Sequence, residues 1–263
     1  MPAVICGSLA YDTIMVFQDQ FKNHILPDQM HILNVSFLVP AMRREFGGCA
    51  GNIAYNLKLL DNNQITAFHP GAMSSAQENH VRDIPQIDFA IVAPDGREAM
   101  LQHVDEFAAR GVPFIFDPGQ AMPLFNGDEF RSMIAKSTYV IVNDYESQLL
   151  QTRTGWSAAE IASHVTAYIV TQGPRGSTIH VGDESHHIPP ARERVIVDPT
   201  GCGDAYRAGL MFGIMHGKDW PTTGRIASLM GALKVEHPGT QNQRFSYPEF
   251  SAEFADQFGY TLD

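Results

Sequence analysis

The sequence feature that most constrains the fold is the stretch DPTGCGDA at residues 198–205, which runs directly into an apolar segment. Its composition is typical of a strand exit, a glycine-rich turn and the start of a helix. Gly201 and Gly203 allow the backbone to bend sharply and a ligand to approach without a Cβ in the way. The first amide groups of such a helix, with the positive end of its dipole, attract an anion, and a phosphate fits such a site.

The residues around this turn suggest phosphoryl transfer. Asp204 lies where it could take a proton from an attacking hydroxyl, although the same pattern also fits a simple N-cap before an apolar helix. Arg207 is expected on the same helix face as Asp204, where it could neutralise a transferred phosphate or merely pair with an acid at the surface. Cys202 has no activating histidine or second cysteine nearby in the sequence, so we predict a packing role for its thiol.

Composition limits the function further. The 263 residues are 44% hydrophobic and 18% charged, which suits a single large α/β domain. A net charge of −11 argues against a general nucleic-acid or membrane surface but permits a local site for a small anion. Three widely spaced cysteines give no disulfide framework or zinc pattern and fit a reducing compartment. Without a signal peptide or an apolar run long enough to span a bilayer, the expectation is a soluble, cytoplasmic protein.

Strand-like and helical segments alternate along most of the chain, which predicts a parallel, doubly wound sheet. Residues 13–39 contain two strand-like pieces, 13–17 and 31–39, and resemble a small flap outside the main sheet. The remaining strands are expected at residues 3–9, 65–69, 88–93, 112–117, 139–142 and 167–171, with an antiparallel edge at 177–181, 184–188 and 194–197. The helices are expected in a segment ending at Leu60, at 95–110, from 143 onward, and at 204–216, 222–236 and 247–258.

Further polar and glycine residues lie where strands are expected to end. Asp12 follows the first strand and could hold a diol, or it could be an ordinary turn acid. Gly47 and Gly48 precede a helix in whose first turn Asn52 could bond hydroxyl groups, although a glycine turn could also serve geometry alone. The sequence has neither a GxxxxGK[ST] loop nor a GxGxxG after the first strand, so the turn at Gly201–Gly203 is the candidate anion site for any nucleotide.

Four motifs occur in the order seen in the ribokinase-like (PfkB-type) carbohydrate and nucleoside kinases: GGCAGN at 47–52, NxxE at 143–146, TxGxxG at 171–176 and DxTGxGD at 198–204. The chain resembles this family nearly end to end, and the segments at 204–209 and 236–241 look most like bacterial adenosine kinases. The resemblance implies a three-layer α/β/α sandwich with a small, here reduced, β lid. It also implies one domain over residues 1–263, with the lid formed by about 13–39 and possibly 61–70.

The resemblance implies a role for each matched position. Asp204 would be the general base, and the phosphoryl group would be held by Gly201, Cys202, Gly203 and Arg207. The residues that would bind the nucleoside are Ser8, Asp12, Gly47, Gly48 and Asn52. Asn143 and Glu146 would organise Mg²⁺ through water. The residues that would border ATP are Thr171, Gly173, Gly176, Gly231, Ala232 and His237.

The chain departs from the family between Leu60 and Asp61, where related kinases place several tens of additional residues. Such a deletion would remove one crossover unit and thin the lid, and the protein would be a natural or engineered minimal form or would lack a segment. The remaining sheet is expected to close up or to pair with a second copy. Three functions stay open: ATP-dependent phosphorylation of the 5′-hydroxyl of adenosine in purine salvage, phosphorylation of another sugar or nucleoside, and nucleoside binding without turnover.

Overall fold

The computed structural model describes residues 2–16, 41–60, 65–68 and 73–262, with the backbone alone described for 12–16, 41–42, 65–68 and 73–74. Its main sheet has eight strands in the order β10-β9-β8-β7-β6-β5-β1-β4. The strands are β1 (Ala3–Cys6), β4 (Ile65–Phe68), β5 (Phe89–Val92), β6 (Phe114–Phe116), β7 (Tyr139–Asn143), β8 (Ala167–Thr171), β9 (Ser177–Val181) and β10 (Glu184–Ile188). Neighbours from β4 to β8 are parallel, and β9 and β10 form an antiparallel edge.

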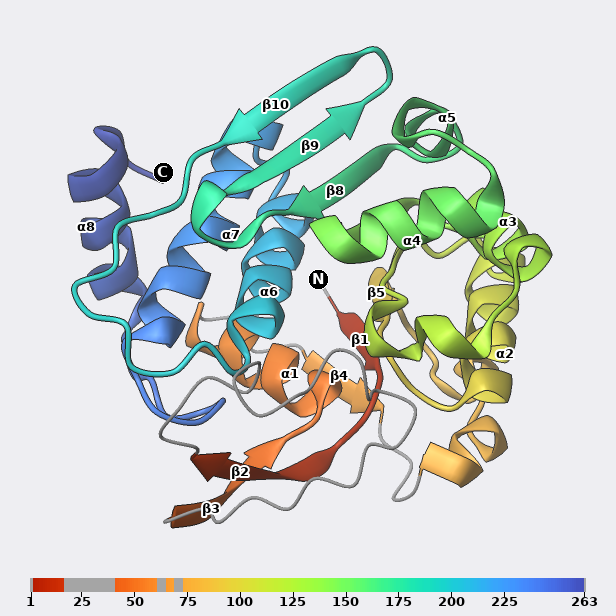
Figure 1. Ribbon diagram of the computed structural model, residues 1–263, viewed down its shortest axis with the longest axis horizontal. Helices are drawn as coiled ribbons and strands as arrows, with labels where there is room; N and C mark the ends of the chain where they lie inside the picture. Colours follow the sequence, from red (N-terminus) through yellow and green to blue (C-terminus); the bar gives the residue numbers. More distant parts are fainter. Residues whose placement is uncertain (1, 17–40, 61–64, 69–72, 263) are drawn as a thin grey trace, which may run out of the picture.

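Helices cover both faces of this sheet, which gives a three-layer α/β/α sandwich (Figure 1). Side chains of β1 alternate between the two cores, with Ala3 and Ile5 in one and Val4 and Cys6 in the other. The first core is covered by α1 (Cys49–Leu59), α6 (Cys202–Met215), α7 (Trp220–Val235) and α8 (Tyr247–Phe258). The second is covered by α2 (Arg97–Ala109), α3 (Gly127–Lys136), α4 (Asp144–Thr154) and α5 (Ala158–Ser163). The predicted fold class is confirmed.

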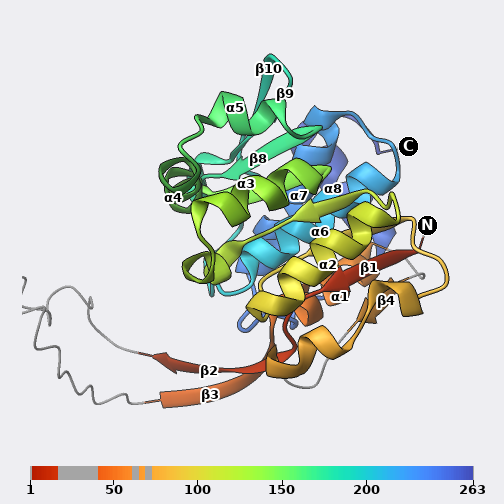
Figure 2. The same ribbon diagram turned by 90° about the vertical axis from the view of Figure 1, so that its right-hand side faces the viewer.

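A two-stranded flap stands apart from the main sheet. It consists of β2 (Ala10–Val16) and β3 (Ala41–Gly47), which pair antiparallel with Asp12 opposite Glu45, and Figure 2 shows it extending away from the body of the molecule. Residues 13–16 of the strand expected at 13–17 therefore belong to β2, whereas residue 17 and the piece at 31–39 lie outside the described residues. The sequence did not indicate β3, because its polar run of Arg43, Arg44 and Glu45 lacks the apolar alternation of a half-buried strand.

One predicted strand is wrong. Residues 194–197 form no strand, and Val195, Ile196 and Val197 are exposed to 53%, 67% and 50%. The physical reason is that this segment runs past the end of α7, where the amide of Val197 donates to the carbonyl of Val235 at 2.9 Å. Its apolar residues therefore line a surface near the helix end and do not join the sheet.

The strand that follows α1 in the chain joins the main sheet. Strand β4 pairs directly with β1, in register from Ala3–Ile65 to Cys6–Phe68, and forms one edge of the sheet. This matches the first of the two expected outcomes, in which the remaining strands close up. Within the described residues, no helix is both long and apolar enough to cross a membrane.

Candidate active site

The glycine-rich turn starts helix α6, as the sequence predicts. Gly201 is the N-cap residue with φ 80°, a left-handed conformation that favours glycine, and its carbonyl accepts from the amide of Ala205 at 3.0 Å. The amide of Cys202 donates to the carbonyl of Pro199 at 3.2 Å and so stabilises the turn itself. Gly203 is exposed at the start of the helix, and Asp204 lies in its first turn.

Asp204 contacts the first turn of α1. The side-chain nitrogen Nδ2 of Asn52 donates to Oδ2 of Asp204 at 2.9 Å, and Asn52 is only 3% exposed. Two motifs 152 residues apart in the chain therefore meet at this carboxylate. The structure brings together the predicted base and one predicted nucleoside-binding residue.

The other residues expected to bind the nucleoside shape the start of α1. Gly48 has φ 85°, and a Cβ on it would lie 2.4 Å from the carbonyl oxygen of Ser8, so only glycine fits. That carbonyl accepts from the amide of Ala50 at 3.0 Å, and the hydroxyl of Ser8 accepts from the amide of Cys49 at 3.2 Å. Ser8 therefore satisfies amides of the first helical turn, while Gly47 ends β3. The backbone of Asp12 lies in β2, and its side chain is outside the description.

A pocket of about 370 Å³ adjoins the start of α6. Five of the residues expected to border ATP line it, together with two residues of the glycine-rich turn: Thr171, Gly173, Gly176, Gly231, Ala232, Cys202 and Gly203. Much of the remaining lining is apolar, including Pro190, Ala191 and Ile196. His237 is not among the residues that line this pocket. It lies in a second depression beside Arg244 and Glu249, with its Nδ1 3.0 Å from the carbonyl oxygen of Leu233.

Asn143 and Glu146 form a capping box at the start of α4. The amide of Glu146 donates to Oδ1 of Asn143 at 2.8 Å, and the amide of Asn143 donates to Oε2 of Glu146 at 2.7 Å. Burial raises the pKa of Glu146, and the hydrogen bond from Asn143 lowers it less. A desolvated carboxylate of this kind suits a hard cation such as Mg²⁺, which binds oxygen ligands and keeps several waters. In the described part of the chain, no group of three histidine, cysteine, aspartate or glutamate residues is arranged to hold a metal directly.

Arg207 pairs with a buried acid. Its Nη2 donates to Oδ1 of Asp117 at 2.8 Å, and its Nε donates to Oδ2. Burial alone lowers the pKa of Arg207, but the charges of Asp117, Asp204 and Glu146 and the bonds to Asp117 outweigh it, so the net pKa is raised. Arg207 therefore does pair with an acid, but the pair is buried, whereas the pairing alternative predicted a pair at the surface. Asp117 was a missed site residue, although its place at the end of a predicted strand was a signal.

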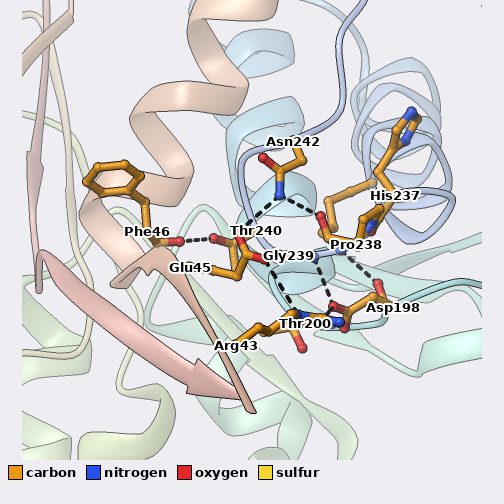
Figure 3. Close-up of polar contacts among 11 residues, drawn as sticks. Arg43, Glu45, Phe46, Asp198, Thr200, His237, Pro238, Gly239, Thr240 and Asn242 are labelled. Carbon is orange, nitrogen blue, oxygen red and sulfur yellow. Dashed lines mark hydrogen bonds and ion pairs between the residues drawn. The ribbon is translucent and has the colours of Figure 1, made fainter. Parts of the chain in front are cut away.

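Asp198 connects the turn to the flap and to the loop after α7 (Figure 3). Its carboxylate accepts from Arg43, from the amide of Thr200 at 3.0 Å and from the amide of Gly239 at 2.9 Å. Burial alone raises the pKa of Asp198, but these backbone hydrogen bonds and the charge of Lys234 lower it overall.

Lys234 is a fully buried ammonium group beside the same turn. It donates to the carbonyl of Asp198 at 2.7 Å and to that of His237 at 3.1 Å, and burial lowers its pKa. The sequence gives one signal for this contact, a lysine within the apolar run of α7.

The family model described as pfkB family carbohydrate kinase matches residues 60–245, so the chain belongs to that family of phosphotransferases.

The individual relatives include nucleoside kinases. The curated nucleoside kinase of Methanocaldococcus jannaschii is 29% identical over 69% of this chain, which spans 59% of that relative's length. The structure of the Burkholderia thailandensis nucleoside kinase in complex with inosine is 44% identical, with a TM-score of 0.91 over 98% of this chain and 99% of that one. The complex of the same kinase with ADP-inosine has 48% identity and a TM-score of 0.88 over 98% and 97% of the two chains.

Proposed function

We propose that this chain catalyses ATP-dependent phosphorylation of the 5′-hydroxyl of a purine nucleoside, with adenosine converted to AMP in purine salvage. The observation that carries the proposal is the first turn of α6, where Cys202 and Gly203 line the 370 Å³ pocket and the next residue, Asp204, is bonded to Asn52. Phosphoryl transfer depends on positioning and charge neutralisation, and this turn combines an anion site with an adjacent base.

In this scheme the pocket binds ATP. Its apolar lining, with Ile196 and Ala232 among it, suits a nucleobase, while the glycines allow close approach to the phosphates. The ADP-inosine complex of the Burkholderia relative supports a nucleotide as the phosphoryl donor. Asp204 would take the proton of the acceptor hydroxyl, and the amides at the start of α6 would stabilise the charge on the phosphoryl group.

Glu146 and Asn143 would hold Mg²⁺ near the triphosphate through water. A bound magnesium ion would neutralise phosphate charge during transfer. The capping box keeps the Glu146 carboxylate fixed at the start of α4, since Oε2 accepts from the amide of Asn143. Burial raises the pKa of this group, and a bound cation would oppose that shift by stabilising the charged form.

The flap would serve as a lid over the acceptor. Tyr11 and Phe46 are 58% and 64% exposed, and their rings lie 5.0 Å apart, so the flap presents an aromatic surface to a nucleoside or to the lid of a second copy. In this proposal, residues 1–263 form one kinase domain that lacks a family segment between Leu60 and Asp61, and the protein is cytoplasmic. Cys6, Cys49 and Cys202 are free thiols, which supports a reducing compartment.

The test is ADP formation from ATP and Mg²⁺, measured with no acceptor and with adenosine, inosine, ribose or fructose. ADP release that depends on adenosine or inosine supports the proposal and ranks the acceptors. Turnover with ribose or fructose alone would identify a sugar kinase. No turnover with any acceptor, while adenosine still raises the melting temperature, would identify a nucleoside-binding protein.

A further inference from the structure

Two side-chain amides lead from the Asp204 carboxylate to the loop between α7 and α8. Asn52 donates through Nδ2 to Asp204, and its Oδ1 accepts from Nε2 of Gln241 at 2.8 Å. An ionised carboxylate can only accept hydrogen bonds, and an amide donates only through its nitrogen. The charge on Asp204 therefore decides which end of Asn52 faces it, and Gln241 must present its nitrogen to the other end.

This arrangement uses both ends of the Asn52 amide. One N–H of Asn52 contacts Asp204 and its oxygen contacts Gln241, while Nδ2 carries a second hydrogen, so the predicted contact with ribose hydroxyls stays compatible with this arrangement. Its backbone carbonyl accepts a third bond, from Nδ2 of Asn56 at 2.7 Å. Asn52 is thus held as part of the support for Asp204.

The loop that carries Gln241 is anchored on both sides of it. Before Gln241, the amide of Gly239 donates to Asp198 at 2.9 Å and the hydroxyl of Thr240 donates to the carbonyl of Phe46 (Figure 3). After it, Nε2 of Gln243 donates to Oδ1 of Asn56. The backbone of Gln241 is therefore fixed between the turn at Asp198, β3 and α1.

The surface of α1 leaves room for the Gln241 amide. Gly51, one residue before Asn52, has no side chain, and a Cβ built there would lie 3.3 Å from Nε2 of Gln241 and 2.4 Å from Cδ2 of Leu9. Any larger residue would press on both side chains. Gly51 thus leaves space on α1 beside the Gln241 amide.

We infer that Gln241 is a positioning residue for phosphoryl transfer: it fixes the orientation of the Asn52 amide, which in turn holds Oδ2 of Asp204. The inference rests on the proposed function, in which Asp204 is the general base. The helix fixes the backbone of Asp204, so the remaining freedom is rotation of its side chain. Restricting that rotation keeps the base aligned with the acceptor hydroxyl, and alignment is a large part of catalysis at such a site.

Two substitutions distinguish the effect of the Gln241 N–H donor from the effect of the size of its side chain. Gln241→Met keeps the length but removes the donor, and Gln241→Glu offers only an acceptor, which would draw Nδ2 of Asn52 away and turn Oδ1 toward Asp204. We expect kcat to fall about tenfold in Gln241→Met, in line with the loss of one hydrogen bond between two neutral amides. We expect a fall of about a hundredfold in Gln241→Glu, because the turned Asn52 amide would then replace its hydrogen bond to the charged Asp204 by repulsion. The Kd for the nucleoside, measured by calorimetry, should change by a smaller factor than kcat in both variants, because aligning the base matters mainly in the transition state.

Asn242→Ala is the matched control. Its side chain is exposed and bonds the carbonyl of Pro238 at 2.8 Å and Glu45 at 3.3 Å, without contacting Asn52, so kcat should stay near wild type. Equal kcat in the Met and Glu variants, or a raised nucleoside Kd with kcat retained, would overturn the inference. If Gln241→Glu does not fold, the kcat and Kd of Gln241→Met against Asn242→Ala still decide. A wild-type chain without turnover would overturn the proposed function itself, and with it this inference.

Discussion

Arg207 and Asp117 form a two-point ion pair in the interior, beside the start of α6. Nη2 of Arg207 lies 2.8 Å from Oδ1 of Asp117, and the two side chains are 11% and 2% exposed. They come from positions 90 residues apart, on α6 and just after β6. The pair ties the helix that carries Asp204 to the carboxyl end of the central strands, where ligands of α/β sheets collect.

Removing the charge of Asp117 should therefore destabilise the protein strongly. In Asp117→Asn the buried guanidinium loses its counter-charge, and breaking a buried pair in this way typically costs about 3–5 kcal/mol. The measurement is the free energy of unfolding from urea denaturation. The control is Asp105→Asn, since Asp105 pairs with Lys136 at 2.7 Å on the surface and should change stability by less than about 1 kcal/mol. Equal effects of the two variants would contradict a structural role for the buried pair.

Glu146 provides a pH-dependent test. Because burial raises the pKa of Glu146 above its ordinary 4.5, its contribution to stability is complete below pH 4.5 and is lost as pH rises through the folded-state pKa. Gln can also occupy the third position of a capping box, so Glu146→Gln keeps the cap and removes this titration. We expect the free energy of unfolding of Glu146→Gln, relative to wild type, to increase as pH rises from 4 to 7 in urea titrations.

Glu249 gives a control of opposite sign. It occupies the same capping position in α8, but hydrogen bonds from Ser246 lower its pKa. Its contribution is therefore present above pH 4.5 and is lost as pH falls through the folded-state pKa. Glu249→Gln should lose stability relative to wild type as pH rises over the same range. The same trend in both variants would show that burial does not control the Glu146 carboxyl.

Gly231 tests the assignment of the pocket. It lines the pocket on α7, and a Cβ built there would meet only the carbonyl oxygen of Cys202, at 3.7 Å. Gly231→Leu should place a side chain in this space and weaken ATP binding by at least about tenfold, or 1.4 kcal/mol. Binding of adenosine should be unchanged. Calorimetry with ATP and with adenosine measures both affinities.

Gly231→Ala is the matched variant for this prediction. Alanine adds a single methyl group and favours a helix over glycine by up to about 1 kcal/mol, so the protein should be more stable while ATP binding changes little. Unchanged ATP affinity in Gly231→Leu would mean that the nucleotide binds elsewhere.

The sequence predicts the sheet and most of the helices because their signals are local. Buried strands such as β5 and β7 are short apolar runs, and the predicted C-terminal helices follow glycine turns or capping residues. Helices α3 and α5 went unpredicted, although Asn126 with Glu129 and Ser157 with Glu160 form capping boxes that mark their starts. The apolar segment at 194–197 misled the prediction because periodicity cannot show that its backbone bonds the end of a helix.

For the site, too, the sequence predicts the locally encoded features and misses the contacts between distant residues. The glycine motifs predict the start of α6 and much of the pocket lining, because turn geometry and close approach require particular residues. The contacts that fix the side chains escape local patterns: Arg207 meets Asp117 across 90 residues, and Gln241 meets Asn52 across 189. Such pairs depend on how the strands and helices are ordered in space, and no spacing within one element encodes them.

The most direct test of the account is the turnover of Asp204→Asn with ATP, Mg²⁺ and the best nucleoside acceptor. Asparagine keeps the size of the side chain but cannot accept the proton of the hydroxyl, and general base catalysis contributes about 10²–10⁴ in rate. We predict a loss of kcat in that range, with nucleoside and ATP still bound as judged by calorimetry. Turnover within a few-fold of wild type would contradict the assignment of Asp204 as the base.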